Sequence, residues 1–192
     1  RYDGKKWEAL EPMGRRPAVV LDLAAWNGRL WAALSDGTVW ASAAGSATAR
    51  EDWVQEHAVQ DGRRASALAA RGDVLYVGES VVGRGLQSAE GEVCLHRLKR
   101  TGQWEIAQTF SEEGGISCLC LHGDRLHAGG HSGSVYVERG GELHREASLG
   151  FPVMALRPVG DILLAACGKR PAWVPDDPGA IPLEWSASGF GG

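Results

Sequence analysis

Short apolar runs alternate with Gly- and Asp-containing turns along the chain, and residues 114–149 show the pattern most clearly. Ile116 and Leu119 belong to one run, and Val135 and Val137 alternate with polar neighbours in another. These segments are too short for helices, and their β-rich composition is typical of extended backbone. The pattern therefore predicts successive antiparallel strands joined by tight turns as a meander.

The same pattern recurs in four copies, each marked by a pair of leucines seven residues apart. The pairs are Leu23 and Leu30, Leu68 and Leu75, Leu119 and Leu126, and Leu156 and Leu163. Three positions before each pair stand Val20, Ala65, Ile116 and Val153, and three positions after it stand the small residues Ala33, Gly78, Gly129 and Ala166. Small residues at this position are expected where neighbouring backbones crowd together.

Each copy is long enough for four strands. Trp7, Trp53 and Trp104 lie 16, 15 and 15 residues before the first leucine of their copies, and Leu143 takes this place in the fourth. We expect the three tryptophans to be structural anchors at equivalent sites. The spacing of the copies, measured at the second leucine, is 45, 51 and 37 residues. Propeller blades of roughly 40 to 50 residues fit this spacing, and leucine-rich repeats of roughly 20 to 29 do not.

Two segments, SDGTVWAS after Leu30 and SGSVYVE after Leu126, resemble the inner hairpin of a WD-repeat β-propeller. The resemblance implies an all-β fold, a β-propeller built from four-stranded antiparallel blades. The Gly-His pair and the closing Trp-Asp pair of that family are missing, because Ala41 follows Trp40 and Glu138 follows Val137. Kelch-like and other propellers therefore stay open as alternatives.

The repeats extend over the whole chain and predict one propeller domain, in which each repeat begins with the outer strand of a blade. The repeats run approximately over 1–45, 46–100, 101–139 and 140–187, followed by a flexible tail at 188–192. Four blades would make a small ring for this family, since propellers close with about 4 to 8. We expect the chain to be part of a larger propeller or to be completed by another propeller segment or chain.

In the first copy, the apolar run VVLDLAA precedes a tight hairpin turn at Asn27-Gly28. We expect Val20, Leu21 and Leu23 of this run to be buried, because they are the large apolar side chains of a strand in the core pattern.

Trp26, Trp31 and Trp40 all lie in the first copy. Large side chains with one polar tip commonly pack between blades, where the indole N–H finds a partner. Trp40 and Tyr136 fall at corresponding places in their copies, which favours this packing role. The alternative is a carbohydrate-binding propeller lectin that uses exposed tryptophans to stack on sugars.

Composition excludes some partners. The chain has 192 residues, 44% of them hydrophobic, and a net charge of −4. This charge gives no general reason to bind nucleic acid or an anionic membrane, and no apolar run approaches the roughly 18 residues that span a bilayer. The four cysteines form no evident disulfide framework, which favours a reducing, intracellular setting, cytoplasmic or another compartment.

The sequence shows no strong motif for a metal site or a phosphate-binding loop. Cys118 and Cys120 share one face of a strand, near the histidines at 122, 127 and 131, but the sequence lacks the close ligand pairs typical of closed zinc sites. Free thiols that behave as small apolar side chains are the favoured interpretation. The insertion ESVVGRGLQSAEG lacks the Lys-Ser/Thr of a phosphate-binding loop and is interpreted as a surface loop.

We therefore predict a protein that is not an enzyme and that has no cofactor and no metal. No Gly-x-Ser-x-Gly elbow is present, and the sequence does not place the carboxylates of Asp22, Glu79 and Glu92 together. A propeller enzyme remains the less favoured alternative, because one fold hosts many functions.

The predicted function is a non-catalytic protein–protein interaction scaffold, a subunit or domain of a larger assembly. Matching basic pairs, Arg15-Arg16 and Arg63-Arg64, precede the innermost strands of two consecutive repeats. Arginine forks suit carboxylates, so these residues predict a surface for acidic segments of a protein partner.

A Pro-rich arm follows Cys167 and is predicted to emerge on the same face as the insertion. Its candidate contact residues are Trp173, Asp176 and Asp177. Four prolines in this arm prevent regular strand pairing and favour a semi-rigid docking segment.

Overall fold

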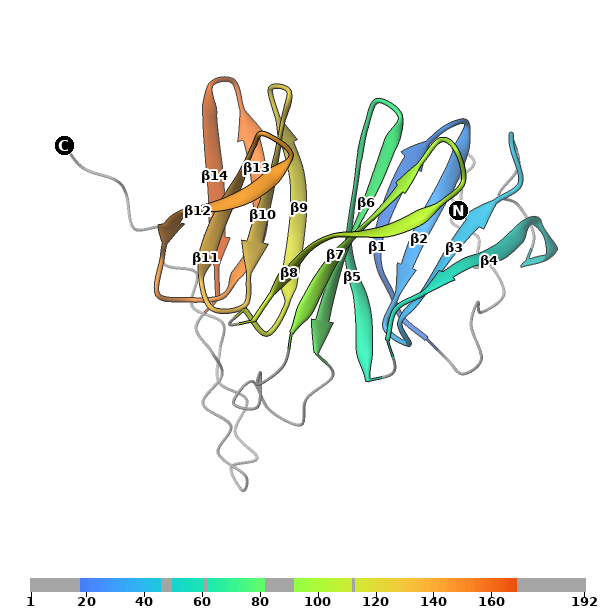
Figure 1. The fold of residues 1–192 in the computed structure, drawn as a ribbon, viewed down its shortest axis with the longest axis horizontal. Coiled ribbons are helices and arrows are strands. Elements are labelled where there is room, and N and C mark those ends of the chain that lie inside the picture. Colours follow the sequence, from blue (N-terminus) through green and yellow to red (C-terminus); the bar gives the residue numbers. More distant parts are fainter. Residues whose placement is uncertain (1–17, 46–49, 61, 82–91, 112, 169–192) are drawn as a thin grey trace, which may run out of the picture.

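The described part of the chain consists almost entirely of short antiparallel strands (Figure 1). The computed structural model describes residues 18–45, 50–60, 62–81, 92–111 and 113–168. The strands are β1 (Val20–Trp26), β2 (Arg29–Leu34), β3 (Thr38–Ser42), β4 (Trp53–Ala58), β5 (Arg63–Arg71), β6 (Val74–Val81), β7 (Val93–Lys99), β8 (Trp104–Phe110), β9 (Ile116–His122), β10 (Arg125–Gly130), β11 (Ser134–Arg139), β12 (Glu142–Ser148), β13 (Val153–Val159) and β14 (Ile162–Cys167). A 3₁₀ turn, Arg50–Asp52, precedes β4. Within these ranges no helix is long and apolar enough to cross a membrane.

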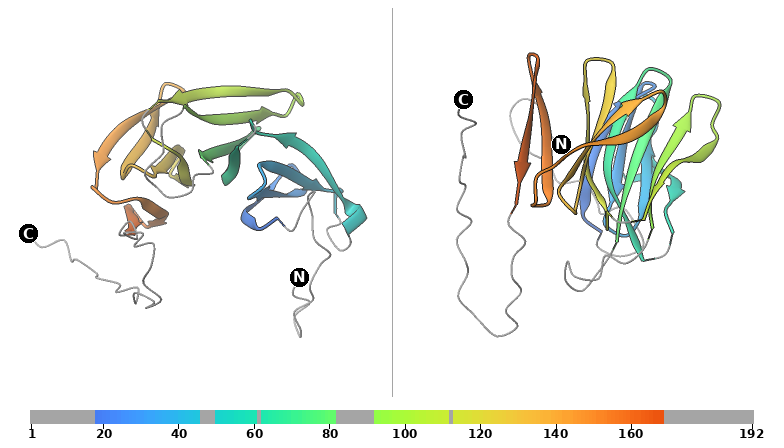
Figure 2. Two further views of the ribbon diagram at one scale, coloured as in Figure 1. Left: turned by 90° about the horizontal axis from the view of Figure 1, so that it is seen from below. Right: turned by 60° about the vertical axis from the view of Figure 1, so that its left-hand side comes forward.

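Consecutive strands pair into four separate sheets. β1 to β4 form sheet 1, β5 to β8 form sheet 2, β9 to β12 form sheet 3, and β13 pairs with β14 in sheet 4. β1 contacts β5, β5 contacts β9, and β9 contacts β13, so the first strands line the inside of the arc. Figure 2 shows the sheets as blades around an arc that stays open. The predicted all-β propeller fold with four-stranded antiparallel blades is confirmed.

Each complete sheet takes its fourth strand from the start of the next sequence repeat. Trp53 opens β4 and pairs with Ser42 of β3, and Trp104 opens β8 and pairs with Leu98 of β7. This pairing agrees with the predicted order of strands, in which a repeat begins with the outer strand of a blade. Trp7 lies outside the described residues, and the division into repeats stays a prediction.

Neighbouring sheets interlock through the two positions that flank the leucine pairs. A Cβ atom added to Gly78 of β6 would lie 2.7 Å from Cγ2 of Ile116 on β9, and one added to Gly129 of β10 would lie 2.6 Å from Cγ1 of Val153 on β13. The small residue of one sheet therefore receives the first strand of the next. The crowding that selects small residues comes mainly from these side chains, and not from neighbouring backbones as the sequence suggested.

Hydroxyl groups on the first strands add polar links between sheets. Ser66 Oγ donates to the carbonyl of Ile116 at 2.6 Å, and Ser117 Oγ donates to the carbonyl of Val153. Each of these serines sits at an irregularity of strand register between the first two strands of its sheet. At the bulge each hydroxyl lies between two carbonyl oxygens, one of the next sheet and one of its own sheet, that of Gly78 for Ser66 and that of Gly129 for Ser117, both at 3.0 Å. Sheet 1 is linked to sheet 2 by a different group, Asp22, which follows the irregular residue of β1 and whose Oδ2 accepts from the N–H of Leu68 at 2.7 Å.

The predicted burial of Val20, Leu21 and Leu23 is wrong. Their side chains are 40%, 40% and 53% exposed. The prediction assumed a neighbour on both faces of the first sheet, but sheet 1 has a described neighbour only on the side of sheet 2. The turn at Asn27-Gly28 is confirmed, since both residues have positive φ, 51° and 70°, as a two-residue turn between twisted strands requires.

The tryptophans of the first copy are buried, and Trp26 and Trp31 pack between two sheets as the packing interpretation predicted. Trp26 and Trp31 belong to the apolar cluster between sheets 1 and 2, and Trp40 packs with Trp53 on the other face of sheet 1. Their indole N–H groups are satisfied: Trp26 donates to the carbonyl of Gly72 at 2.9 Å, and Trp31 to that of Trp26 at 3.3 Å. Trp104 is half-buried and stacks on His57 with ring centroids 4.3 Å apart.

The connections divide between two rims. The hairpin turns β1–β2, β5–β6, β9–β10 and β13–β14 lie on the upper rim in Figure 1. The strands β6 and β14 end on the opposite, lower rim, where β5 begins. Arg63 at the start of β5 pairs with Val81 at the end of β6. The insertion and the Pro-rich arm themselves lie outside the described residues.

Trp53 tests the anchor role. Trp53→Ala should lower the free energy of unfolding by about 3–5 kcal/mol, because the indole is 5% exposed and its removal leaves a cavity beside Leu34 and Trp40 on one face of sheet 1. Val54→Ala, on the same strand and 55% exposed, is the control and should change it by less than about 0.5 kcal/mol. Equal denaturation midpoints for the two variants in urea would contradict the role of Trp53 as a core anchor.

Candidate functional site

One position on the third strand of each complete sheet carries a side chain with a buried polar tip. Trp40 pairs with Ala32, His96 with Val77, and Tyr136 with Ala128, so the three residues occupy the same place in their sheets. The pairing of the third and fourth strands shifts register just before this residue in all three sheets. Each sheet satisfies the polar tip in a different way.

In sheet 1 the partner is a hydroxyl two residues away. Trp40 Nε1 donates to Thr38 Oγ1 at 2.8 Å, and Thr38 Oγ1 donates to Asp36 Oδ1 at 2.6 Å. Asp36 also accepts from the N–H of Thr38 at 3.1 Å, which fixes the turn between β2 and β3. This chain of hydrogen bonds ties the third strand to its own turn.

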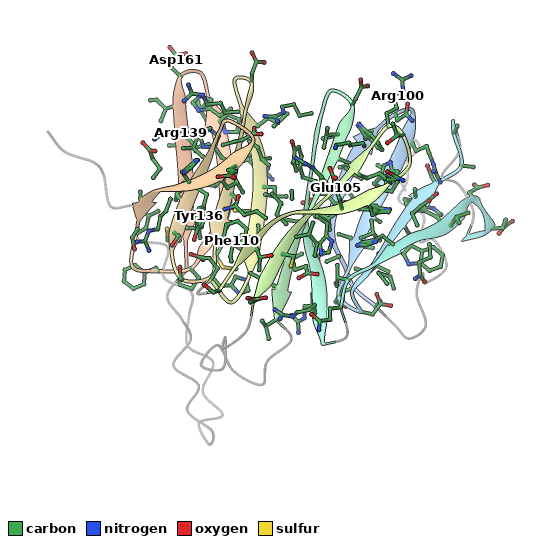
Figure 3. The ribbon with its side chains drawn as sticks, viewed as in Figure 1. Arg100, Glu105, Phe110, Tyr136, Arg139 and Asp161 are labelled. Atoms are coloured by element: carbon green, nitrogen blue, oxygen red, sulfur yellow. The ribbon has the colours of Figure 1, made fainter. Side chains whose placement is uncertain are left out.

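In sheet 3 the partner is a carboxylate from the connection that enters the sheet. Tyr136 and Ser132 both donate to Glu113 Oε1 at 2.6 Å, and Glu113 is 4% exposed. The carboxylate occupies the space above Gly130, where a Cβ atom would collide with it. Burial raises the pKa of Tyr136, and the hydrogen bond to Glu113 raises it further. Figure 3 shows Tyr136 beside Phe110, whose ring centroid lies 5.1 Å away.

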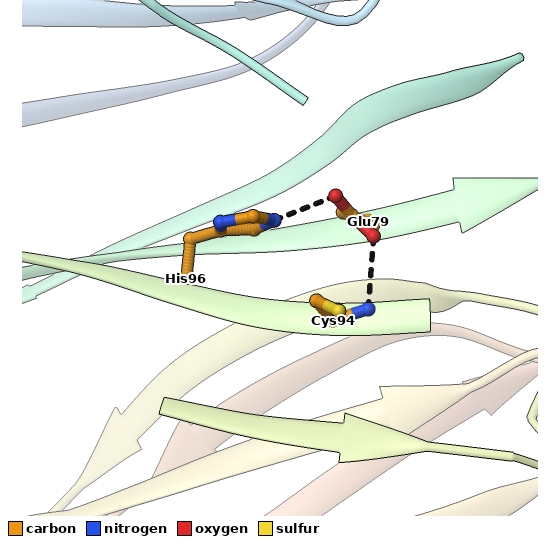
Figure 4. A group of neighbouring side chains, drawn as sticks. All are labelled: Glu79, Cys94 and His96. Carbon is orange, nitrogen blue, oxygen red and sulfur yellow. Dashed lines mark hydrogen bonds and ion pairs between the residues drawn. The ribbon is translucent and has the colours of Figure 1, made fainter. Parts of the chain in front are cut away.

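In sheet 2 the carboxylate comes from the sheet itself. Glu79, on β6, stands at the register position of Gly130 in sheet 3, since Gly78 pairs with Leu95 as Gly129 pairs with Val135. Its Oε1 lies 2.6 Å from His96 Nε2, and its Oε2 accepts from the N–H of Cys94 at 2.9 Å (Figure 4). Glu79 is 2% exposed and His96 8% exposed.

Glu79 is held as an anion within this cluster. Burial alone would raise the pKa of its carboxyl, but the hydrogen bonds with His96 and with the N–H of Cys94 bring it below its usual value. The charges of His96 and Arg63 act in the same direction. Burial raises the pKa of the Cys94 thiol.

His57, from the outer strand of sheet 1, reaches the same interface. It pairs with Val39, which belongs to the cluster between sheets 1 and 2, and its ring centroid lies 5.0 Å from that of His96. Burial lowers the pKa of His57 to about 4, with help from the charge of His96. Its Nε2 atom is buried and has no hydrogen-bond partner among the described residues.

The cysteines and histidines singled out from the sequence of the third copy do not gather into a site. Cys118 and Cys120 pack in the apolar cluster against sheet 4 and are free thiols, as predicted. Burial raises the pKa of Cys118 to about 11. In the part of the chain that the structure describes, the one group of three or more metal-ligand side chains is Glu79, Cys94 and His96.

The predicted binding residues are only partly within the described chain. Arg15, Arg16, Trp173, Asp176 and Asp177 lie outside it. Arg63 and Arg64 are half-buried at the lower rim, on opposite faces of β5, because successive side chains of a strand alternate. Arg63 Nη1 and Arg64 Nε are buried without a hydrogen-bond partner among the described residues.

Sequence reasoning missed the buried polar positions. Glu79 was singled out only as a carboxylate, and Glu113 and His57 were not singled out. The sequence did contain one usable signal. Leu34, Glu79 and Gly130 directly follow the small residues of their copies, so they occupy equivalent positions. Only the second copy has a charged residue there, which distinguishes sheet 2 from sheets 1 and 3. Glu113 gives no such signal, because its connection differs in length from its counterparts.

The crowded place above Gly130 yields a prediction. Gly130→Ala should lower the free energy of unfolding by about 1–3 kcal/mol, because the methyl group displaces the Glu113 carboxylate from Tyr136 and Ser132. In a Glu113→Ala background the same change should cost under about 1 kcal/mol, since the colliding carboxylate is gone. Equal costs of Gly130→Ala in both backgrounds, measured by chemical denaturation, would show that Glu113 does not fill this space.

No protein-family model matches the sequence, and no curated protein sequence matches it either. Solved structures are similar in fold at low identity. The designed protein Ika4 is 15% identical with a TM-score of 0.57, and the match covers 84% of this chain and 92% of Ika4. The designed protein Ika8 is 17% identical with a TM-score of 0.55, and the match covers 83% of this chain and 46% of Ika8.

Sqt1 of Saccharomyces cerevisiae, a WD40 propeller, is 16% identical with a TM-score of 0.51. The match covers 79% of this chain and 43% of Sqt1, so this chain spans less than half the length of Ika8 and of Sqt1. These neighbours confirm the resemblance at the level of the fold: the described sheets are successive blades of a β-propeller.

Proposed function

We propose that the chain is a segment of a larger β-propeller that acts as a non-catalytic scaffold for protein–protein interaction and binds an acidic partner segment through its lower rim. The observation that carries the proposal is the arginine pair at the start of β5. Arg63 and Arg64 open β5 at the rim where β6 and β14 also end. Their side chains are half-buried, and guanidinium N–H groups donate paired hydrogen bonds to carboxylates.

The two arginines differ in what they already contact. Arg63 shares the face of β5 that is turned toward Glu79, and its charge lowers the pKa of that carboxyl. Arg64 lies on the other face, so a substitution there leaves the electrostatic effect on Glu79 unchanged and reports on partner binding alone. Arg15 and Arg16, in the corresponding place of the first repeat, and Trp173, Asp176 and Asp177 of the Pro-rich arm complete the proposed surface.

The scaffold role is favoured over the two alternatives by particular side chains. The lectin alternative requires exposed tryptophans, but Trp26, Trp31, Trp40 and Trp53 are each at most 8% exposed. For an enzyme, the carboxylates considered from the sequence would have to face a common space. Asp22 instead links two strands through the N–H of Leu68, and Glu79 is engaged with His96.

Charge reversal tests the arginine surface. Arg64→Glu, alone and with Arg15→Glu and Arg16→Glu, should abolish capture of a protein partner from a lysate of the source organism. A synthetic acidic segment of the partner identified by mass spectrometry should bind the native chain, and should bind it more weakly as salt rises.

Two exposed arginines on the upper rim provide matched controls. Arg100→Glu and Arg139→Glu change the charge by the same amount per residue and should leave capture intact (Figure 3). Capture that survives in the folded Arg64→Glu protein, or that is lost equally in the controls, would remove the lower rim from consideration.

The proposal also includes completion of the ring. Large exposed apolar residues gather at the two ends of the arc. They are Val19, Val20, Leu21 and Leu23 in or beside β1, and Phe151, Met154, Val159, Ile162 and Leu164 in or beside sheet 4. We infer that both end faces pack against further propeller sheets, supplied by the same polypeptide or by another chain. The faces of sheets 2 and 3 that are turned toward neighbouring sheets are covered in this way.

Removing the apolar character of the ends tests this inference. The 192-residue chain should self-associate and bind a hydrophobic dye, and Leu23→Glu with Ile162→Glu should reduce both effects, as measured by light scattering and dye fluorescence. Val54→Glu with Ile106→Glu, which changes exposed apolar residues on outer strands, should not. A monodisperse, cooperatively folding native monomer that binds no dye would contradict completion by further sheets.

A further inference from the structure

We infer that Glu79, Cys94 and His96 of sheet 2, together with His57 of sheet 1, form a structural zinc site that fastens the first two blades to each other. The inference goes beyond the scaffold function and does not depend on it. It rests on three ligand side chains gathered on sheet 2, Glu79, Cys94 and His96 (Figure 4), and on the His57 ring of sheet 1, which lies beside that of His96.

Three of the ligands share one face of one sheet. Cys94 and His96 are two residues apart on β7, so both side chains point to the same side. Glu79 lies beside them on β6, and one ligand atom from each of the three residues lies within 4.8 Å of the others. Tetrahedral zinc with bonds of about 2.0–2.3 Å brings its ligand atoms to about 3.3–3.8 Å from each other. Shifts of about 1 Å would therefore bring these three ligand atoms to the distances of a zinc site. His57 lies outside this group of three, and its ring has to turn toward them to complete the site.

The fourth ligand comes from the opposite sheet. Two imidazoles that share a tetrahedral zinc ion have ring centroids about 5 Å apart, given the Zn–N bond length. The rings of His57 and His96 are 5.0 Å apart. The Nε2 atom of His57 is buried without a described hydrogen-bond partner, which leaves a ring nitrogen for the ion.

The other two complete sheets have no such ligands at the same positions. The strand register equates Glu79 with Leu34 and Gly130, Cys94 with Thr38 and Ser134, and His96 with Trp40 and Tyr136. It also equates His57 with Gln108 and Ala147. Packing of the propeller thus does not require a ligand at any of these four positions. Their coincidence at one interface is the strongest argument for a shared ligand.

The chemistry of the ligand set selects zinc. One thiolate, two imidazoles and one carboxylate give the N, S and O ligands that zinc takes in tetrahedral sites. A thiolate and a carboxylate also cancel the two charges of the ion, so that the filled site is neutral inside the interface. On binding, the thiol proton of Cys94 and the proton between His96 and Glu79 leave to solvent. Four protein ligands leave no open position, so the site is structural and not catalytic.

Metal titration of the full chain tests the inference. The reduced, chelator-treated protein should bind one Zn²⁺ per chain, and its melting temperature should rise with added ZnCl₂. CoCl₂ in place of zinc should produce a thiolate-to-cobalt charge-transfer band. Cys94→Ser should abolish this band, and Cys94→Ser and His57→Gln should each lower zinc affinity by more than the roughly 10- to 100-fold typical of changes around a metal site.

The other cysteines provide the control. A chain with Cys118→Ser, Cys120→Ser and Cys167→Ser keeps Cys94 as its one thiol and should retain both the cobalt band and the zinc affinity. If Cys94→Ser fails to fold, this variant still shows whether Cys94 provides the thiolate ligand. Absence of stoichiometric zinc binding by the folded native chain would overturn the inference, as would a cobalt band that disappears in the chain with Cys94 alone. Unchanged zinc affinity in folded His57→Gln would remove the link between blades.

Discussion

The structure depends on one repeated steric fit, in which a small residue on the second strand of a blade receives a side chain from the first strand of the next. Gly78 receives Ile116, and Gly129 receives Val153, with distances that leave no room for a Cβ atom. Ala33 and Ala65 share the corresponding interface between sheets 1 and 2. The fit always joins the second strand of one blade to the first strand of the following blade. Each blade therefore determines the position of the next one, and the successive sheets form an arc.

The steric fit is the same in each blade, but the buried hydrogen-bonded side chains differ from blade to blade. Trp40, His96 and Tyr136 occupy one position of the third strand, and each needs a partner because a buried polar tip without one is costly. The partner is a hydroxyl in sheet 1, a carboxylate from the strand in sheet 2 and a carboxylate from the connecting segment in sheet 3. The fold constrains where a polar partner must lie and not which residue provides it. Sheet 2 is thus able to gather metal ligands without losing its architecture.

The two ends of the arc differ from its middle because the steric fit is used on one side only. Leu23 and Leu164 are about half exposed, whereas the equivalent faces of sheets 2 and 3 are covered. This asymmetry gives the described blades apolar ends and a polar rim, two surfaces with different chemistry. Packing with further sheets suits the ends, and recognition of charged groups suits the rim.

The sequence by itself determined the strands, their order and the blade architecture, because these follow from local alternation, turn residues and a repeat period that tertiary contacts do not alter. The leucine pairs, the small residues that follow them and the turn at Asn27-Gly28 were all readable in this way. The tertiary structure alone decided which apolar residues are buried, because burial of Val20, Leu21 and Leu23 depends on a neighbouring sheet and not on their own strand. It also decided that His57 meets His96 and that Glu113 reaches Tyr136, since these pairs come from different strands or from a connection whose path the repeat does not specify.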